Sequence, residues 1–101
     1  MRAVTDETFD DAVLASEQPV LVDFWAPWCR TCLRMMPVVE KFAAEAPTWD
    51  VVSVNVEDSP ETAARFKVLS LPTLIAFQNG TPVARKTGAV KQQELLSLLD
   101  E

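Results

Sequence analysis

Two cysteines, Cys29 and Cys32, have the residue type and the spacing that best suit chemistry in this chain. They are the only cysteines among 101 residues, and the chain contains no histidine. At the start of a helix, a spacing of three residues places both sulfur atoms on one face, close enough to bond to each other. The unpaired N–H groups and the macrodipole of the helix N-terminus favour the thiolate of Cys29. Because the thiolate is the reactive form in disulfide exchange, the pair predicts redox chemistry.

A structural disulfide or half of a metal site are the alternative interpretations of the pair. Structural zinc usually takes four Cys or His ligands, so a zinc or iron–sulfur site here would need cysteines from a second chain. The N-terminus turns acidic at Asp6 and Glu7 and has no apolar signal-peptide core, which predicts a cytoplasmic protein. The cytosol disfavours a lasting structural disulfide, so a cycling catalytic pair is the favoured interpretation.

Composition limits the remaining classes of function. The chain length fits one domain over residues 1–101, and the apolar content of 49% is that of an ordinary globular protein. A net charge of −6 argues against nucleic acid or an anionic membrane surface as a partner. No stretch approaches the ~20 apolar residues that span a bilayer. We therefore expect no nucleic-acid and no membrane partner.

The cysteines lie between an expected strand and an expected helix. The nearly continuous apolar run Val20–Trp25 predicts a strand covered on both faces, which makes the carboxylate of Asp23 exceptional. A helix is expected from Arg30 to about Ala46, with Pro37 inside it.

Periodicity and turn signals predict the other elements. The expected strands and helices are a strand at 2–4, a helix at about 7–16 capped by Thr5 or Asp6, a strand at 51–56, a helix from the cap Ser59 to about Phe66, strands at 73–78 and 82–87, and a helix at about 91–100 with Leu95, Leu96, Leu98 and Leu99 in the core. Asn79-Gly80 predicts a hairpin, and Pro82 predicts an edge strand. This order gives a mixed sheet with helices on both faces.

Four blocks of this sequence resemble the thioredoxin family in order and spacing, and the similarity covers nearly the whole chain. The blocks are Val22-Asp23-Phe24-Trp25-Ala26-Pro27-Trp28-Cys29 through Cys32 and Pro37, Leu71-Pro72-Thr73-Leu74, Phe77 with Asn79-Gly80, and Gly88-Ala89. The resemblance implies the α/β thioredoxin fold, a three-layer α/β/α sandwich around a mixed five-stranded sheet. It also implies an oxidoreductase that reduces protein disulfides, in which Cys29 attacks, Cys32 resolves, Trp28 covers the site and Pro72 is cis.

The residues between the cysteines depart from the family, which usually has Gly-Pro where this chain has Arg30-Thr31. We expect the charge of Arg30, with Arg34 one turn later, to stabilise the Cys29 thiolate and make the pair more oxidising. Thr31 removes the rigid φ of a proline from the helix start. A solvated surface arginine without a redox role is the alternative.

The surroundings of Asp23 also depart from the family, since Ser53 stands where a lysine is usual. Burial raises the pKa of a carboxyl group, and such a group can take a proton from Cys32. Without the lysine, we expect Asp23 to stay protonated to a higher pH than in relatives that have it.

An apolar surface around Cys29 is expected to bind substrate. Its candidate members are Trp28, Val56, Leu71, Pro72 and Ala89. Pro72 would leave the backbone of Leu71 free to pair with an extended substrate segment.

Together these features predict a monomeric, cytoplasmic protein-disulfide reductase. The cysteine pair would carry the electrons without a cofactor. The family resemblance implies a flavoprotein thioredoxin reductase that would reduce the pair again after each turnover. Two alternatives stay open at this point: a more oxidising oxidase, isomerase or glutathione-linked protein, and a binding subunit without enzymatic activity.

Overall fold

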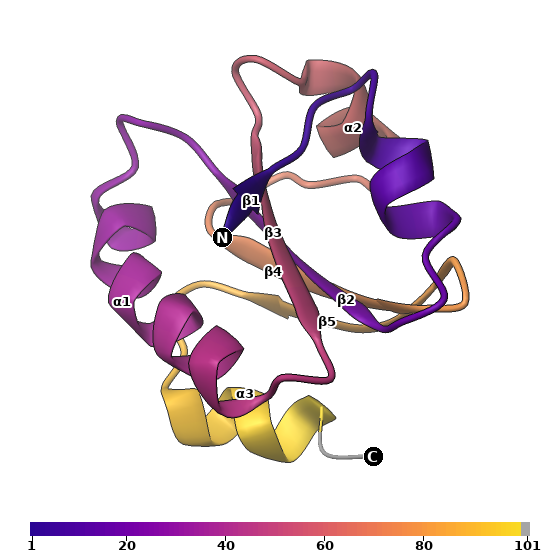
Figure 1. Ribbon diagram of the computed structural model, residues 1–101. Helices are drawn as coiled ribbons and strands as arrows, with labels where there is room; N and C mark the ends of the chain where they lie inside the picture. Colours follow the sequence, from indigo (N-terminus) through magenta and orange to yellow (C-terminus); the bar gives the residue numbers. More distant parts are fainter. Residues whose placement is uncertain (100–101) are drawn as a thin grey trace.

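The computed structural model describes residues 1–99 (Figure 1). The elements in chain order are β1 (Arg2–Ala3), the π-helical segment η1 (Asp10–Leu14), β2 (Val20–Trp25), α1 (Arg30–Glu45), β3 (Asp50–Asn55), α2 (Pro60–Arg65), β4 (Thr73–Gln78), β5 (Thr81–Thr87) and α3 (Gln92–Leu99). Among these residues, no helix has the length and apolar character needed to cross a membrane.

The five strands form one mixed sheet in the order β1-β3-β2-β4-β5. β3 is parallel to both β1 and β2, whereas β4 is antiparallel to β2 and to β5. β2 therefore lies at the centre, and its residues from Val20 to Phe24 are all buried. The predicted mixed sheet, with its apolar central strand, is confirmed.

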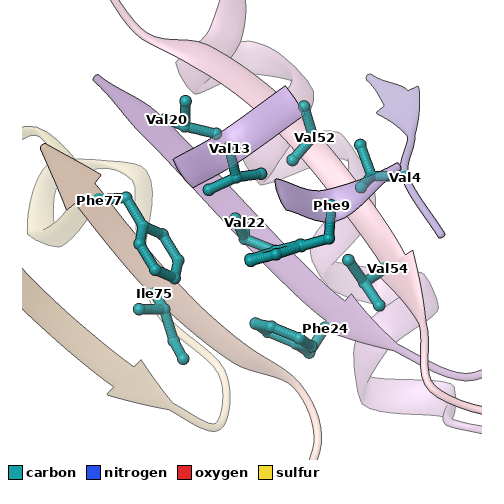
Figure 2. Packing of buried hydrophobic residues seen from close by; sticks show 10 residues of the cluster. All are labelled: Val4, Phe9, Val13, Val20, Val22, Phe24, Val52, Val54, Ile75 and Phe77. Carbon is teal, nitrogen blue, oxygen red and sulfur yellow. The ribbon is translucent and has the colours of Figure 1, made fainter. Parts of the chain in front are cut away.

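Alternation along β2 decides which helices cover each face of the sheet. Val20, Val22 and Phe24 point into a cluster with η1 and the segment after α2 (Figure 2). Leu21 points to the opposite cluster, which α1 and α3 cover. Asp23 is separated from Leu21 by one residue and so lies on the face that α1 covers.

The hairpin between β4 and β5 is confirmed at Asn79-Gly80. Both residues have positive φ, 53° and 77°, as a type I′ turn requires. A Cβ at Gly80 would also lie 2.6 Å from the carbonyl oxygen of Leu14, so glycine is required there for space as well. Pro82 lies in β5, the edge strand that its presence predicts.

The caps of η1 and α2 differ from the prediction. The Asp6 carboxylate caps α2: it accepts hydrogen bonds from the N–H of Thr62 at 2.8 Å and of Glu61 at 3.2 Å. The Ser59 hydroxyl makes no side-chain cap and instead accepts from the N–H of Asp6 at 3.1 Å. A capping residue type is visible in a sequence, but the helix that it reaches depends on the tertiary fold.

Two predicted helices change their bounds. The helix expected at 7–16 is reduced to turns leading into η1. In α3, Leu95 and Leu99 are buried, but the prediction that Leu98 is in the core is wrong, because its exposed fraction is 43%. Successive residues are about 100° apart around a helix, so Leu98 turns away from the face that Leu99 buries. Residue 100 of the predicted helix lies outside the described residues.

Candidate active site

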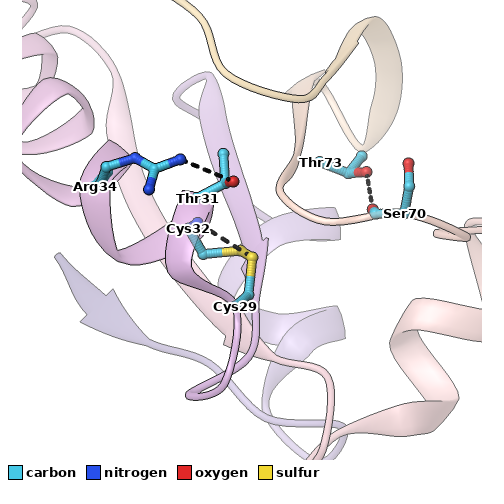
Figure 3. The surroundings of a disulfide bond; sticks show 6 residues. All are labelled: Cys29, Thr31, Cys32, Arg34, Ser70 and Thr73. Carbon is cyan, nitrogen blue, oxygen red and sulfur yellow. Dashed lines mark hydrogen bonds between the residues drawn. A yellow bond between two sulfur atoms is a disulfide. The ribbon is translucent and has the colours of Figure 1, made fainter.

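Cys29 and Cys32 form a disulfide at the start of α1, with 5.2 Å between their Cα atoms (Figure 3). Cys29 is the N-cap residue, in extended conformation, and its Sγ accepts a hydrogen bond from the N–H of Cys32 at 3.1 Å. A sulfur in this position receives an N–H group that has no partner inside the helix. The site can therefore stabilise negative charge on Cys29 when the disulfide is open.

The two cysteine residues differ in exposure. Cys29 retains 8% of its surface, whereas Cys32 retains 1%. Ala26 is buried with them, and Trp25, Val56 and Leu71 pack against the pair. Trp25 therefore serves as a packing residue of the site.

Trp28 lies on the surface beside Cys29, with 65% of its area exposed. Its indole Nε1–H donates a hydrogen bond to the Glu57 carboxylate. This contact of Glu57 was not predicted from the sequence. A signal was available, because Trp25 and Asn55 are paired in the parallel strands β2 and β3. The segments that follow those strands must leave the sheet at the same edge.

The loop before β4, which carries Ser70, approaches the disulfide through Leu71 (Figure 3). The Leu71–Pro72 peptide bond is cis, as the resemblance implied. The Thr73 hydroxyl donates to the carbonyl of Ser70 at 2.7 Å, which fixes the loop. Within residues 1–99, neither the N–H nor the C=O of Leu71 takes part in a hydrogen bond.

The segment before α3 joins this loop to α1. The N–H of Gly88 donates to the carbonyl of Pro72 at 2.9 Å, which places the exposed Ala89 next to the cis-proline loop. The N–H of Val90 donates to the Sδ of Met35 in α1 at 3.3 Å. The structure thus brings together the predicted surface residues around Cys29, although Pro72 itself is buried.

Asp23 is a buried carboxyl group beneath α1. Its exposed fraction is 1%, and within the described residues neither carboxylate oxygen has a hydrogen-bond partner. Desolvation raises its pKa to about 7. Ser53 of β3 and Leu74 of β4 are its register partners, so neither strand neighbour carries a positive charge.

The two residues between the cysteines lie at the surface end of the site. Arg30 is exposed, Thr31 is half-buried, and the Thr31 hydroxyl accepts from the Arg34 guanidinium at 3.3 Å (Figure 3). In the part of the chain that the structure describes, no group of three or more His, Cys, Asp or Glu side chains could hold a metal ion.

Comparisons with known proteins agree with this geometry. The thioredoxin family model matches residues 1–101. The thioredoxin of Mycobacterium tuberculosis is 48% identical over 99 residues, which cover 97% of this chain and 85% of that protein. The thioredoxin of Mycolicibacterium smegmatis is 46% identical over 102 residues, covering 98% and 91%. A bifunctional thioredoxin reductase/thioredoxin of Mycobacterium leprae is 46% identical over 99 residues, covering 97% of this chain and 22% of that protein.

These matches and the Cys29–Cys32 disulfide establish the reaction class. The protein is a thiol–disulfide oxidoreductase that reduces protein disulfides, and its own cysteine pair carries the electrons, so no cofactor is required. The chain belongs to the thioredoxin family.

Proposed function

We propose that this chain is a monomeric, cytoplasmic reductase of protein disulfides, formed by one domain over residues 1–101, in which Cys29 is the attacking thiol. The observation that carries the assignment is the asymmetry of the pair. Cys29 is the more exposed residue and its sulfur receives the helix N–H, whereas Cys32 is enclosed. A nucleophile needs both access and a stabilised thiolate.

The reaction then runs in two exchanges. The Cys29 thiolate attacks one sulfur of the substrate disulfide, forms a mixed disulfide and releases the other sulfur as a thiolate, which takes up a proton. Cys32 loses its proton and attacks the Sγ of Cys29, which re-forms the Cys29–Cys32 disulfide and releases the second substrate thiol. Two electrons pass from the dithiol to the substrate.

Asp23 is the proposed acceptor of the Cys32 proton. Asp23 lies on the sheet face that α1 covers, and Cys32 is in the first turn of α1. A pKa of about 7 suits a group that takes up and releases a proton near neutral pH.

The proposed substrate surface consists of Trp28, Val56, Leu71, Pro72 and Ala89. The free backbone of Leu71 supports pairing with an extended segment of the substrate. The apolar contacts of Val56 and Leu71 with the cysteine pair support a dry surface around the reacting sulfurs. Arg30, Thr31 and Ser53 are proposed to tune the pair and Asp23 without contacting the sulfurs of the substrate.

A flavoprotein thioredoxin reductase is the proposed electron donor. The Mycobacterium leprae relative carries both activities in its name, which supports a reductase as partner for the present chain.

The roles of the two cysteines are tested with single serine variants and a disulfide-bonded protein substrate. Cys29→Ser should abolish turnover, since no accessible thiolate is left. Cys32→Ser should accumulate a covalent complex between substrate and Cys29, visible by mass spectrometry and released by dithiothreitol. Turnover by Cys32→Ser at the wild-type rate would contradict the assignment.

A further inference from the structure

Two arginines without an acidic partner lie in the first two turns of α1, which begins directly after Cys29. Arg30 directly follows Cys29, and Arg34 lies four residues further along α1; both are exposed. Three of the nine basic residues of this chain form ion pairs with carboxylates, namely Arg2 with Asp50, Arg65 with Asp10 and Lys86 with Glu94. Within residues 1–99 the others, Lys41, Lys67, Arg85 and Lys91 as well as the two arginines, form none. Within residues 1–99, neither Arg30 nor Arg34 has a carboxylate oxygen within 4.0 Å.

The geometry of α1 holds these two charges on one side of the site. Residues four apart on a helix have Cβ atoms about 5–6 Å from each other. The Arg34 guanidinium donates to the Thr31 hydroxyl at 3.3 Å, which keeps it beside the first turn. That first turn contains no acidic residue.

Two features make these charges exceptional in this chain. The net charge is −6, so positive charge beside the cysteines is not a property of the surface as a whole. Glu57, the carboxylate that reaches the site from the β3–α2 turn, is already bonded to the indole of Trp28. Within the described residues, Glu57 is therefore not an ion-pair partner of either guanidinium group.

We propose that Arg30 and Arg34 form a carboxylate-binding rim that selects polypeptide disulfides with an Asp or Glu beside the attacked cysteine. The inference rests on the proposed role of Cys29. A guanidinium group offers a planar pair of N–H donors that fits a carboxylate. Because Arg30 directly follows Cys29 and Arg34 lies one helical turn further on, the carboxylate would have to lie within a few residues of the substrate sulfur.

A simple effect on the Cys29 thiolate is the competing explanation. Such an effect changes the rate with every disulfide by the same factor, whether or not the substrate is acidic. Selection by the rim instead changes the ratio of the rate with an acidic substrate to the rate with a neutral one. The ratio therefore separates the two explanations.

The test uses two peptide disulfides of one sequence that differ only in Asp or Asn beside the cysteine. The second-order rate of reduction by the reduced protein is measured for each and divided by the rate with dithiothreitol, which removes intrinsic reactivity. Wild type should favour the Asp peptide. Arg30→Gln and Arg34→Gln should each lower the Asp/Asn ratio about two- to five-fold, the range of an exposed ion pair. The double variant should bring the ratio to about one.

Lys41→Gln is the matched control. Lys41 is exposed on the same helix, 11 residues after Arg30. At about 1.5 Å per residue it lies roughly 16 Å away, beyond the screening length of about 8 Å at physiological salt. This variant should keep the wild-type ratio, and 0.5 M NaCl should lower the ratio of wild type toward that of the double variant.

An Asp/Asn ratio that is the same in wild type and in the double variant would overturn the proposal. So would a fall of the rates with the Asp and the Asn peptide by the same factor. In either case, continued reduction of the Asn peptide would leave the proposed function of Cys29 intact. Failure of wild type to reduce the Asn peptide would instead count against that function.

Discussion

The thioether sulfur of Met35 accepts a hydrogen bond from the backbone N–H of Val90, with 3.3 Å between the two atoms. Both residues are buried, at 4% and 5% exposure. The bond joins α1, which begins at the disulfide, to the segment that carries Ala89. The Met35 side chain, although buried in the core, is thus also a polar anchor of the proposed substrate surface.

Met35→Leu should therefore weaken substrate binding without altering the chemistry. Leucine conserves the apolar volume but leaves the N–H of Val90 without an acceptor, which costs about 1 kcal/mol in unfolding free energy. We expect a higher KM for a protein disulfide and an unchanged rate with a small aromatic disulfide. Met36→Leu, at the half-buried neighbour, is the control and should leave both unchanged. Equal KM values in the two variants would show that the bond does not position Ala89.

Asp23→Asn should change how stability depends on pH in the oxidised protein. Desolvation raises the pKa of Asp23 from 3.8 to about 7 in the folded state, so the folded protein binds more protons than the unfolded chain between these values. The free energy of unfolding of the wild type must then fall as pH rises through this window. Since a shift of one pKa unit corresponds to about 1.36 kcal/mol, the fall is at most on the order of 4 kcal/mol. The Asn variant should lack this component. Urea denaturation at pH 4 and pH 8 measures it, and parallel curves for both proteins would contradict the pKa.

Ser53→Lys should lower the pKa of Asp23. Ser53 is the β3 register partner of Asp23, so a lysine there would bring a positive charge toward the carboxyl group. An opposite charge within about 4–6 Å favours the ionised form and lowers a carboxyl pKa by about 1–3 units. NMR titration of Asp23 measures the shift. Ser53→Met adds similar length without charge and should not lower the pKa; a fall with methionine would exclude the electrostatic cause.

Arg30→Gln should make the cysteine pair more reducing. Loss of a positive charge beside Cys29 destabilises the thiolate, raises the pKa of Cys29 and makes the disulfide form more favourable. Two charges 4 Å apart in water interact by about 1 kcal/mol, which corresponds to a shift of roughly 20 mV or less. Equilibration with a thiol buffer, followed by tryptophan fluorescence, gives the potential. An unchanged reduction potential would show that the charge of Arg30 does not affect the cysteine pair.

The sheet and the position of Asp23 could be predicted because they depend on local patterns. The apolar run Val20–Trp25 identifies a strand buried on both faces, and burial of its single carboxyl group follows directly. Asn79-Gly80 identifies the hairpin between β4 and β5, because few residue types adopt positive φ at both turn positions.

The contacts that complete the site could not be predicted in the same way. Asp6 bonds to Thr62, Trp28 to Glu57, and Met35 to Val90. Each pair joins residues far apart in the chain, and each of these side chains also suits an ordinary local role as cap, surface residue or core filler. Only the register of β2 and β3 contained a usable signal, for Glu57.

The backbone of Leu71 is free to form hydrogen bonds, whereas the two edge strands of the sheet are protected against pairing. In many proteins, unpaired strand edges favour aggregation. β1 is only two residues long. β5 carries Pro82, which has no N–H, and the exposed charges of Arg85 and Lys86, and its pairing with β4 is irregular at Ala76/Phe77. These features disfavour growth of the sheet by a second copy of the chain. The proposed pairing with an extended substrate would thus use the backbone of one loop, while both edges of the sheet disfavour pairing with a second copy of the chain.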